Sequence, residues 1–281
     1  MSRRKDTNSN PYGTLNGPVP SSDNVAGQNE AEEQPLLGGN PKSRPWWRRN
    51  MSADLSRDWA DAVLLACYVI TGLLDSASIS TWGAFVSMQT GNTVYLGLGP
   101  TAGTNRWKKS GLSLCCFALG SYLFSRLHRV LSPTPRTRWV LCLSFALQAA
   151  LIAAAAAIVT WGPRDVGPED VSWYVLVPMG LVAFQSCGQA VASRALKYNA
   201  LTSVVLTSIY CDLFSDAELF AGLRANAERN RRVAAPVLLL AGVLVGGVLA
   251  NSSLGAGGAL WTAVGLKSMI VVSWFFWPEE K

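Results

Sequence analysis

Six apolar runs, each near the length that crosses a lipid bilayer, constrain this chain more than any other feature. A helix needs roughly 20 mostly apolar residues to span the hydrocarbon layer. The runs lie near Trp59–Ile79, Gly111–Leu131, Trp139–Trp161, Val171–Ala192, Val233–Asn251 and Ala256–Trp277. Charged residues make up 15% of the chain, and the runs lack the charged faces that surface helices of a soluble protein need. Residues 58–281 are therefore predicted to form an all-α integral membrane protein domain.

Two further apolar stretches, Trp82–Gly99 and Ala200–Phe214, do not fit a simple span. The first is interrupted by a Thr-Gly-Asn triplet at residues 90–92, and the second is short, rich in Thr and Ser, and closes on Asp212. We interpret them as short polar re-entrant or broken helices. If both crossed the membrane instead, the chain would have eight spans.

The distribution of basic residues favours six spans. With six spans, 19 Lys and Arg residues face the cytosol and 4 face the other side, whereas eight spans give 17 and 6. Basic residues are enriched in cytosolic loops, so the six-span arrangement with a cytosolic N-terminus fits better. The loop at residues 100–110 violates the rule even then, and the choice between six and eight spans stays open.

The six-span arrangement predicts two inverted halves. Each half has three spans, and an odd number places the halves in opposite orientations, as in a 3+3 inverted repeat. The two short polar stretches would then enter from opposite faces, which is typical of a transport site. The similarity between the halves is faint: Gly72 corresponds to Gly188, and Thr90 to Thr207 within a residue.

Residues 1–57 are predicted to form a disordered cytosolic tail. Residues 1–50 are rich in Asn, Gly, Pro, Ser and charge, and they cannot bury enough apolar surface to offset the entropy of ordering. The tail contains an acidic dileucine pattern with Glu32, Leu36 and Leu37. This pattern resembles a sorting signal, so we expect sorting adaptors as partners and delivery to vacuolar or endosomal membranes or to the plasma membrane.

The stretch at residues 72–99 contains a Gly-x-x-Asp pattern followed by an aromatic residue and Thr-Gly-Asn, here Gly72, Asp75, Phe85, Thr90, Gly91 and Asn92. In this motif the chain resembles the YoaK-type family of uncharacterised multi-spanning membrane proteins. The resemblance covers about residues 60–277. Family members are similar in carrying a second Thr-Gly, where this chain has Thr207-Ser208. The resemblance implies a membrane fold and no particular reaction.

Asp75 and Lys267 are ionisable residues placed within predicted spans. A charge at the bilayer centre costs about 2.5–3.5 kcal/mol on insertion scales, so such residues face water or a partner. Lys267 stands in the middle of the last span, and we expect it to meet Asp75 or, failing that, Asp212. Two alternatives remain open. Asp75 caps the next helix, or the last span is shifted so that Lys267 nears an interface.

Three glutamines also lie within spans. Gln148 is central in the third span, and Gln185 and Gln189 lie one turn apart on one face of the fourth. Bonds between polar side chains of neighbouring helices in lipid are worth about 0.6–2 kcal/mol. We therefore expect mainly a packing role, with contact to a solute as the alternative.

The run from Gln89 through Thr90, Gly91 and Asn92 predicts a break in the chain at membrane depth. A glycine between hydrogen-bonding side chains permits non-helical backbone, which survives in a membrane only inside protein or against water. We expect a re-entrant turn that lines a cavity. The alternative is a close helix crossing at the glycine, held by Asn92.

A solute or ion path is expected to use the polar residues at membrane depth together with the glycine of the triplet. These residues are Asp75, Gln89, Thr90, Gly91, Asn92, Gln148, Gln185, Gln189, Thr207, Asp212 and Lys267.

The sequence does not indicate an enzyme. It contains no phosphate-binding Gly-rich loop, no nucleophile–histidine pair and no metal cluster, and it has one histidine, His128. The net charge of +6 comes from basic residues that flank the spans, so we expect no nucleic-acid partner. No cofactor or metal is expected.

The function predicted from these features is transport, by a transporter or channel, of a small solute or ion across a lipid bilayer. The alternative is a non-transporting scaffold or sensor that acts through its N-terminal tail. A membrane enzyme is a third and more distant hypothesis.

Overall fold

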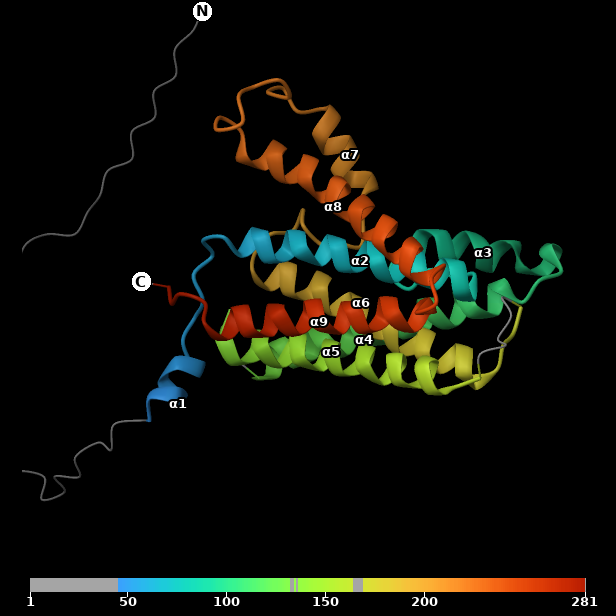
Figure 1. The fold of residues 1–281 in the computed structure, drawn as a ribbon. Helices are drawn as coiled ribbons and strands as arrows, with labels where there is room; N and C mark the ends of the chain where they lie inside the picture. Colours follow the sequence, from blue (N-terminus) through green and yellow to red (C-terminus); the bar gives the residue numbers. More distant parts are fainter. Residues whose placement is uncertain (1–44, 132–133, 135, 164–168, 281) are drawn as a thin grey trace, which may run out of the picture. The chain divides into compact units, whose positions relative to one another are not determined.

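The computed structural model describes residues 45–131, 134, 136–163 and 169–280, which belong to one compact unit. Within these ranges the secondary structure is helical, apart from two isolated bridges. The helices are α1 (Trp46–Met51), α2 (Ala60–Trp82), α3 (Gln89–Ala102), α4 (Arg106–Leu131), α5 (Arg138–Trp161), α6 (Trp173–Ala195), α7 (Thr207–Phe214), α8 (Ala227–Ala250) and α9 (Gly255–Phe275) (Figure 1).

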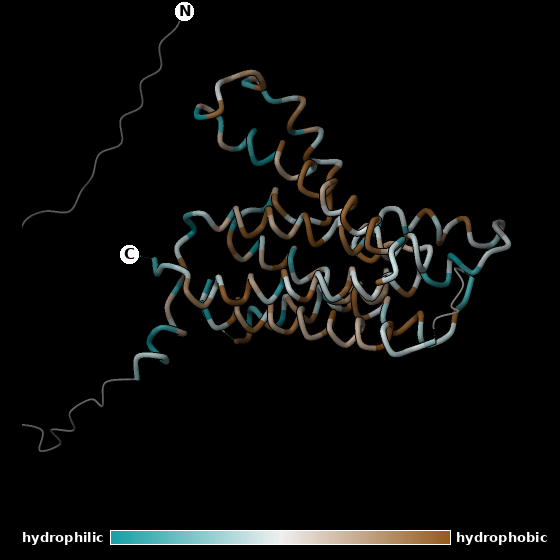
Figure 2. The backbone as a smooth tube through the Cα atoms, viewed as in Figure 1, coloured by the Kyte–Doolittle hydropathy of each residue, from teal (hydrophilic) through white to brown (hydrophobic). Residues whose placement is uncertain are grey.

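Six helices, α2, α4, α5, α6, α8 and α9, are long and apolar enough to cross a membrane. Hydrophobic residues run along these helices, while hydrophilic residues collect at the ends and in the connection between α7 and α8 (Figure 2). The prediction of a multi-pass all-α membrane protein with six spans is confirmed. α8 begins at Ala227 rather than at Val233, because Asn226 caps a polar first turn by accepting a hydrogen bond from the Arg229 N–H, 2.8 Å away.

The long helices pack in a pattern that is unchanged when the two halves are exchanged. α2 packs against α8 of the other half, and α4 likewise packs against α6. α5 contacts both α6 and α9, and α2 also contacts α9. Exchanging α2–α5 with α6–α9 converts α2–α8 into α4–α6 and α5–α6 into α2–α9, and it leaves α5–α9 unchanged. This pattern agrees with the predicted 3+3 repeat.

Glycines allow the paired helices to approach closely. A Cβ on Gly72 of α2 would lie 2.1 Å from the Leu239 carbonyl oxygen of α8, and a Cβ on Gly242 would lie 2.1 Å from the Val69 carbonyl oxygen. Small residues let helix backbones come together in a membrane, where van der Waals packing drives association. The α2–α8 crossing therefore depends on these glycines.

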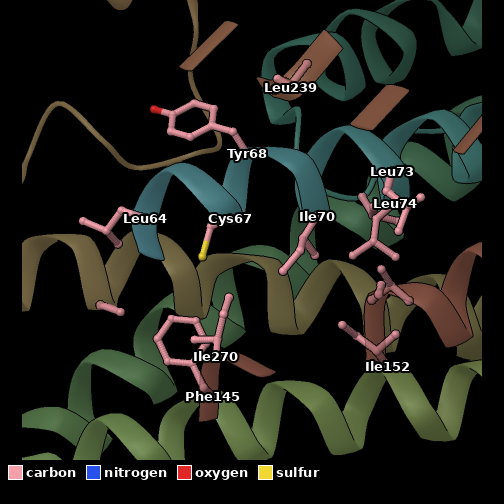
Figure 3. Close-up of a cluster of buried hydrophobic side chains, with 14 of the residues drawn as sticks. Leu64, Cys67, Tyr68, Ile70, Leu73, Leu74, Phe145, Ile152, Leu239 and Ile270 are labelled. Carbon is pink, nitrogen blue, oxygen red and sulfur yellow. The ribbon is translucent and has the colours of Figure 1, made fainter. Parts of the chain in front are cut away.

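Apolar side chains fill the space between α2 and its neighbours. Cys67 of α2 points toward the side on which Phe145 of α5 and Ile270 of α9 lie, whereas Leu239 of α8 lies on the opposite side of α2 (Figure 3). These residues belong to one continuous cluster of buried side chains. The polar residues described below are set into this cluster.

Residues 45–57 belong to the folded unit. The predicted tail, which was given a boundary at residue 57, is therefore shorter than expected. Leu55 is fully buried, Asp54 forms a bridge with Thr137, and Arg138 donates a hydrogen bond to the Asn50 carbonyl oxygen, 2.9 Å away. The segment is ordered because Leu55 and these polar groups find partners beside the start of α5. The proposed sorting signal at Glu32, Leu36 and Leu37 lies outside the described residues.

The spans define two ends of the helix bundle. We call the end at which α2 begins the near end, and the end at which α2 finishes the far end. The start of α5 and the segment after α9 lie at the near end, where Leu55 bridges to Glu279. The start of α4 lies at the far end, where Arg106 bonds the Gly83 carbonyl oxygen.

Candidate functional site

The chain re-enters the bundle directly after α2. α2 ends at Gly83, whose φ of 78° turns the chain back toward the middle of the same helix. The carboxylate of Asp75 then accepts hydrogen bonds from the backbone N–H groups of Val86 and Ser87, each 2.9 Å away, and from the Ser87 hydroxyl. Residues 83–88, here called the first loop, are therefore non-helical backbone held by a buried acid, as lipid surroundings require.

Asn92 holds the same loop from the other side. Its amide donates to the Phe85 carbonyl oxygen at 2.7 Å and accepts from the Phe85 N–H at 3.1 Å. A Cβ on Gly91 would lie 2.9 Å from the Phe85 ring, so the glycine leaves room for the aromatic side chain. The aromatic residue and the Gly-Asn pair of the sequence motif thus form one packing unit.

The position of the predicted break is corrected by this arrangement. Thr90, Gly91 and Asn92 lie in the first turn of α3, and the non-helical backbone precedes them at residues 83–88. The Asn92 side chain bonds backbone groups seven residues earlier in the chain, so the triplet stabilises a break without containing it.

Further side chains satisfy the remaining backbone groups of the first loop. The Ser78 hydroxyl of α2 donates to the Ala84 carbonyl oxygen at 2.7 Å, and the Ser186 hydroxyl of α6 donates to the Val86 carbonyl oxygen at 3.0 Å. With Arg106 on Gly83, the loop is bonded by α2, α3, α4 and α6. It is an ordered part of the membrane domain.

A second loop follows α6 in the same manner. In residues 196–206, here called the second loop, the Tyr198 carbonyl oxygen accepts from the Ser193 hydroxyl, at 2.5 Å. The Gln189 amide donates to Ser203 Oγ at 3.2 Å, and the Tyr68 hydroxyl of α2 donates to the Ala200 carbonyl oxygen at 3.5 Å. The first span of each half therefore bonds the loop of the other half.

Lys267 does not pair with an acid, and the expected contact with Asp75 or Asp212 is wrong. Its ammonium donates to Gln148 Oε1 and lies 5.0 Å from the centre of the Phe145 ring. No carboxylate of the described residues lies within ion-pair distance of it. Asp75 instead accepts three hydrogen bonds from the first loop, and Asp212 is exposed on α7.

Gln148 connects Lys267 to α6. A Cβ on Gly188 would lie 2.6 Å from the Gln148 amide nitrogen, so the glycine lets this side chain lie directly against α6. Several polar side chains of α2, α5, α6 and α9 are almost completely buried, with exposed fractions of 0–2%. We call six of them the polar layer: Thr71, Asp75, Gln148, Gln185, Gln189 and Lys267.

The two glutamines of α6 differ in what they bond. Gln189 donates to Thr71 Oγ1 of α2 at 3.0 Å as well as to the second loop, so it joins separate elements. Gln185 donates only to the Val182 carbonyl oxygen of its own helix, 3.1 Å away. The Oε1 atoms of both glutamines are buried and have no hydrogen-bond partner among the described residues. The packing role predicted for both fits Gln189 and does not fit Gln185.

The remaining predicted residues lie elsewhere. Gln89 is half-buried and supports the first loop by donating to the Val86 carbonyl oxygen at 3.2 Å. Thr90, Thr207 and Asp212 are exposed and are not part of the polar layer. Sequence reasoning missed the hydroxyl residues that complete the site: Thr71, Ser78, Ser87, Ser113, Ser186, Ser193 and Ser203. Ser78, Ser87, Ser193 and Ser203 lie in the loops or within two turns of them in the sequence, which was the available signal for these four residues.

The model of a family described as "Protein of unknown function (DUF1275)" matches residues 63–273, which is most of the chain. The chain belongs to this family. The matched range contains the whole polar layer of this DUF1275 protein and both of its loops. No curated protein and no solved structure matches the chain.

Pockets of this DUF1275 protein open at both ends of the bundle. At the far end a pocket of about 520 Å³ is lined by residues that include Trp82, Thr160 and Tyr174. At the near end a pocket of about 360 Å³ includes Lys197, Tyr198 and residues 200–201 of the second loop. Neither pocket is lined by a member of the polar layer, so the layer lies closed to both.

Proposed function

We propose that this DUF1275 protein moves a small polar solute or ion across a membrane, as a transporter or channel. The observation that carries the proposal is the Gln185 side chain. It is fully buried within a span, and among the described residues it bonds no other helix and its acceptor oxygen has no partner. A buried unsatisfied acceptor costs about 1–3 kcal/mol. A solute that donates a hydrogen bond to Gln185 would supply the missing interaction.

The two loops support the same proposal. They follow equivalent spans of the two halves, and each is bonded by the first span of the opposite half. Non-helical backbone near the midplane of inverted repeats is typical of substrate sites in secondary transporters. Small movements of the loops would connect the polar layer to one end pocket at a time.

The roles of the polar layer and of Asn92 follow from their contacts. Asp75 and Asn92 position the first loop, because all their described bonds go to it, to Gln89 or to Ser113. Lys267 places an ammonium group beside Gln148, and Gln185 and Gln189 offer acceptor oxygens. We propose that Asp75 and Asn92 position the first loop around the solute. The solute itself contacts four side chains, those of Gln148, Gln185, Gln189 and Lys267.

Flux through reconstituted vesicles tests the proposal, with Gln185→Met as the decisive variant. Protein-containing and protein-free liposomes are compared for K⁺, Na⁺, Cl⁻ and H⁺ with potential- and pH-sensitive dyes, and for glycerol and urea by light scattering. We expect at least one of these to move faster with the wild-type protein. Gln185→Met should reduce that flux at least tenfold and leave the thermal midpoint unchanged or raised, because Met keeps the volume and removes the unsatisfied oxygen.

A matched control separates function from folding. Gln189→Met removes bonds to α2 and to the second loop, so it should lower the thermal midpoint, whereas Gln185→Met should not. If no tested solute moves faster than in empty liposomes, or if Gln185→Met conducts like the wild type, the transport proposal is overturned. A scaffold acting through its tail would then be the better hypothesis.

We also propose an orientation in the membrane, a cellular location and a kinship for this protein. The excess of basic residues supports a cytosolic N-terminus, and the tail pattern supports an endosomal, vacuolar or plasma membrane location. The motif at residues 72–92 supports kinship with YoaK-type proteins. We propose that the protein is not an enzyme.

A further inference from the structure

The near-end pocket is strongly basic. It has a volume of about 360 Å³ and lies between the start of α2, the end of α6 and the first turns of α8. Its charged lining consists of four cations and one acid, namely Arg57, Lys197, Arg231, Arg232 and Glu228. Among the described residues, the lining of the far-end pocket contains no charged side chain. The two ends of the molecule are thus chemically different.

Tyr198 organises the cations of this pocket. The guanidinium carbon of Arg57 lies 5.1 Å from the centre of the Tyr198 ring, and that of Arg231 lies 5.4 Å from it. The Tyr198 hydroxyl also donates to the Arg57 carbonyl oxygen at 3.2 Å. The ring therefore joins a cation from the segment before α2 to one from α8.

Two of the four cations have acidic partners. Arg231 pairs with Asp61 at 2.6 Å, and Arg232 pairs with Asp216 at 2.9 Å and with Glu228 at 3.1 Å. A hydrogen bond from the Glu218 N–H lowers the pKa of Asp216, so this acid stays charged beside Arg232. The positive charge of these two arginines is therefore largely compensated.

The other two cations, Arg57 and Lys197, are not compensated. No carboxylate of the described residues lies within 4.0 Å of either side chain. Asp58, the acid next to Arg57 in the chain, accepts instead from the Ser56 hydroxyl at 3.0 Å. The pocket therefore carries a positive charge that an anion from outside the chain could neutralise.

Lys197 occupies a backbone position at which glycine is usual. Its φ is 61°, and its N–H bonds the Arg194 carbonyl oxygen while the Tyr198 N–H bonds that of Ser193. This is the Schellman motif, in which the left-handed residue after the helix is most often glycine. A lysine there is strained relative to glycine, and strained residues of this kind cluster at functional sites.

We propose that the near-end pocket binds a phosphate group, held by Arg57 and Lys197 beside the Tyr198 ring. Guanidinium groups bind phosphate oxygens through paired N–H donors, and lysine binds them as a compact charge. The phosphate belongs either to the headgroup of an anionic phospholipid or to a free phosphate anion. Basic pockets at the ends of transmembrane helices bind anionic headgroups. The site is separate from the polar layer and does not depend on transport.

Binding measurements on the purified full chain in a neutral detergent test the proposal. Isothermal titration is performed with dioctanoyl phosphatidic acid, with inorganic phosphate, and with zwitterionic dioctanoyl phosphatidylcholine as the comparison lipid. We expect saturable binding of phosphatidic acid, of phosphate, or of both, and tighter binding of phosphatidic acid than of phosphatidylcholine. A lipid headgroup site binds phosphatidic acid at least tenfold more tightly than phosphate, and a free phosphate site binds the two alike.

Charge-removing variants assign the binding to this pocket. Combined Arg57→Gln and Lys197→Asn should weaken binding at least tenfold, and Asn tolerates the left-handed backbone at that position. Arg224→Gln removes an exposed cation outside the pocket lining and should change affinity less than twofold. The proposal is overturned if neither phosphate compound binds saturably, if the double variant binds like the wild type, or if Arg224→Gln weakens binding equally. Thermal midpoints confirm that each variant is folded.

Discussion

Buried polar side chains in this protein act mainly on backbone. Asp75 accepts two N–H groups of the first loop, and Asn92 bonds both the N–H and the carbonyl oxygen of Phe85. In the interior of a membrane protein, a turn is stable only if such groups are paired. An acid in a span therefore need not carry an ion or a proton, and here its contacts assign it to the loop.

Asn92→Ala should be strongly destabilising. The variant leaves the N–H and the carbonyl oxygen of Phe85 without their partner, and each unsatisfied buried group costs about 1–3 kcal/mol. We expect a loss of about 2–4 kcal/mol in the free energy of unfolding, measured by reversible denaturation in mixed micelles. The control is Thr90→Ala in the same helical turn, where the exposed side chain makes no hydrogen bond in the described structure. Similar losses for both variants would contradict this account.

Lys197→Gly should stabilise the fold. Glycine removes the strain of a side chain at a φ of 61°, and we expect a gain of about 1 kcal/mol. The same variant removes a cation from the near-end pocket, so stability and phosphate affinity should change in opposite directions. The thermal midpoint and the titration with phosphatidic acid measure the two effects. A decrease in the thermal midpoint would contradict this prediction. It would show that the lysine side chain stabilises the fold by more than its backbone strain destabilises it.

At the scale of elements, composition was sufficient to predict the spans and insufficient to predict the turns between them. The six runs became six long helices, because apolar length alone decides which segments can cross a bilayer. The break after α2 was placed at the triplet of residues 90–92, although it lies at residues 83–88. The polar residues that stabilise the break lie outside it in the sequence. The sequence pattern therefore marks those residues and not the break itself. The partner of Lys267 was also mistaken, because depth along a helix does not specify which neighbour a side chain faces.

The α2–α8 crossing gives an element-scale prediction. Gly242→Ala would place a Cβ 2.1 Å from the Val69 carbonyl oxygen, so the helices must separate. We expect the thermal midpoint in detergent to fall by several degrees. Gly247→Ala in the same helix is the control, because its Cβ would meet no atom of another described element within 4 Å, and alanine favours the helix by about 1 kcal/mol. If Gly242→Ala were as stable as Gly247→Ala, close packing at this crossing would not support the fold.

The whole molecule combines two halves whose packing pattern is unchanged when they are exchanged. The odd number of spans in each half predicted their inversion, and the pairing of α2 with α8 and of α4 with α6 agrees with it. The sequence could not show how the halves are joined, because only faint similarity remains between them. The contacts between the halves include bonds from single hydroxyl groups, such as those of Ser186 and Tyr68, that no periodic pattern distinguishes from ordinary packing residues.

Labelling of single cysteines tests this topology. In a background without other cysteines, Thr104→Cys and Arg224→Cys place thiols in the connections after α3 and after α7. Six spans put these positions on opposite sides of the membrane, so an impermeant maleimide added to sealed vesicles should label only one of them. Labelling of both from the same side would contradict the six-span arrangement. A thiol introduced at residue 49 should be labelled together with residue 224.

The bond from α6 to the first loop bears on how the protein is made. α6 leaves the ribosome after the whole first half, so the Val86 carbonyl oxygen must wait for Ser186 before it gains that partner. Tyr68, in turn, meets Ala200 only once the second loop has been synthesised. Biosynthesis would therefore insert the early spans well before the interior around them is complete. A nascent chain halted after α5 should be membrane-inserted yet readily degraded.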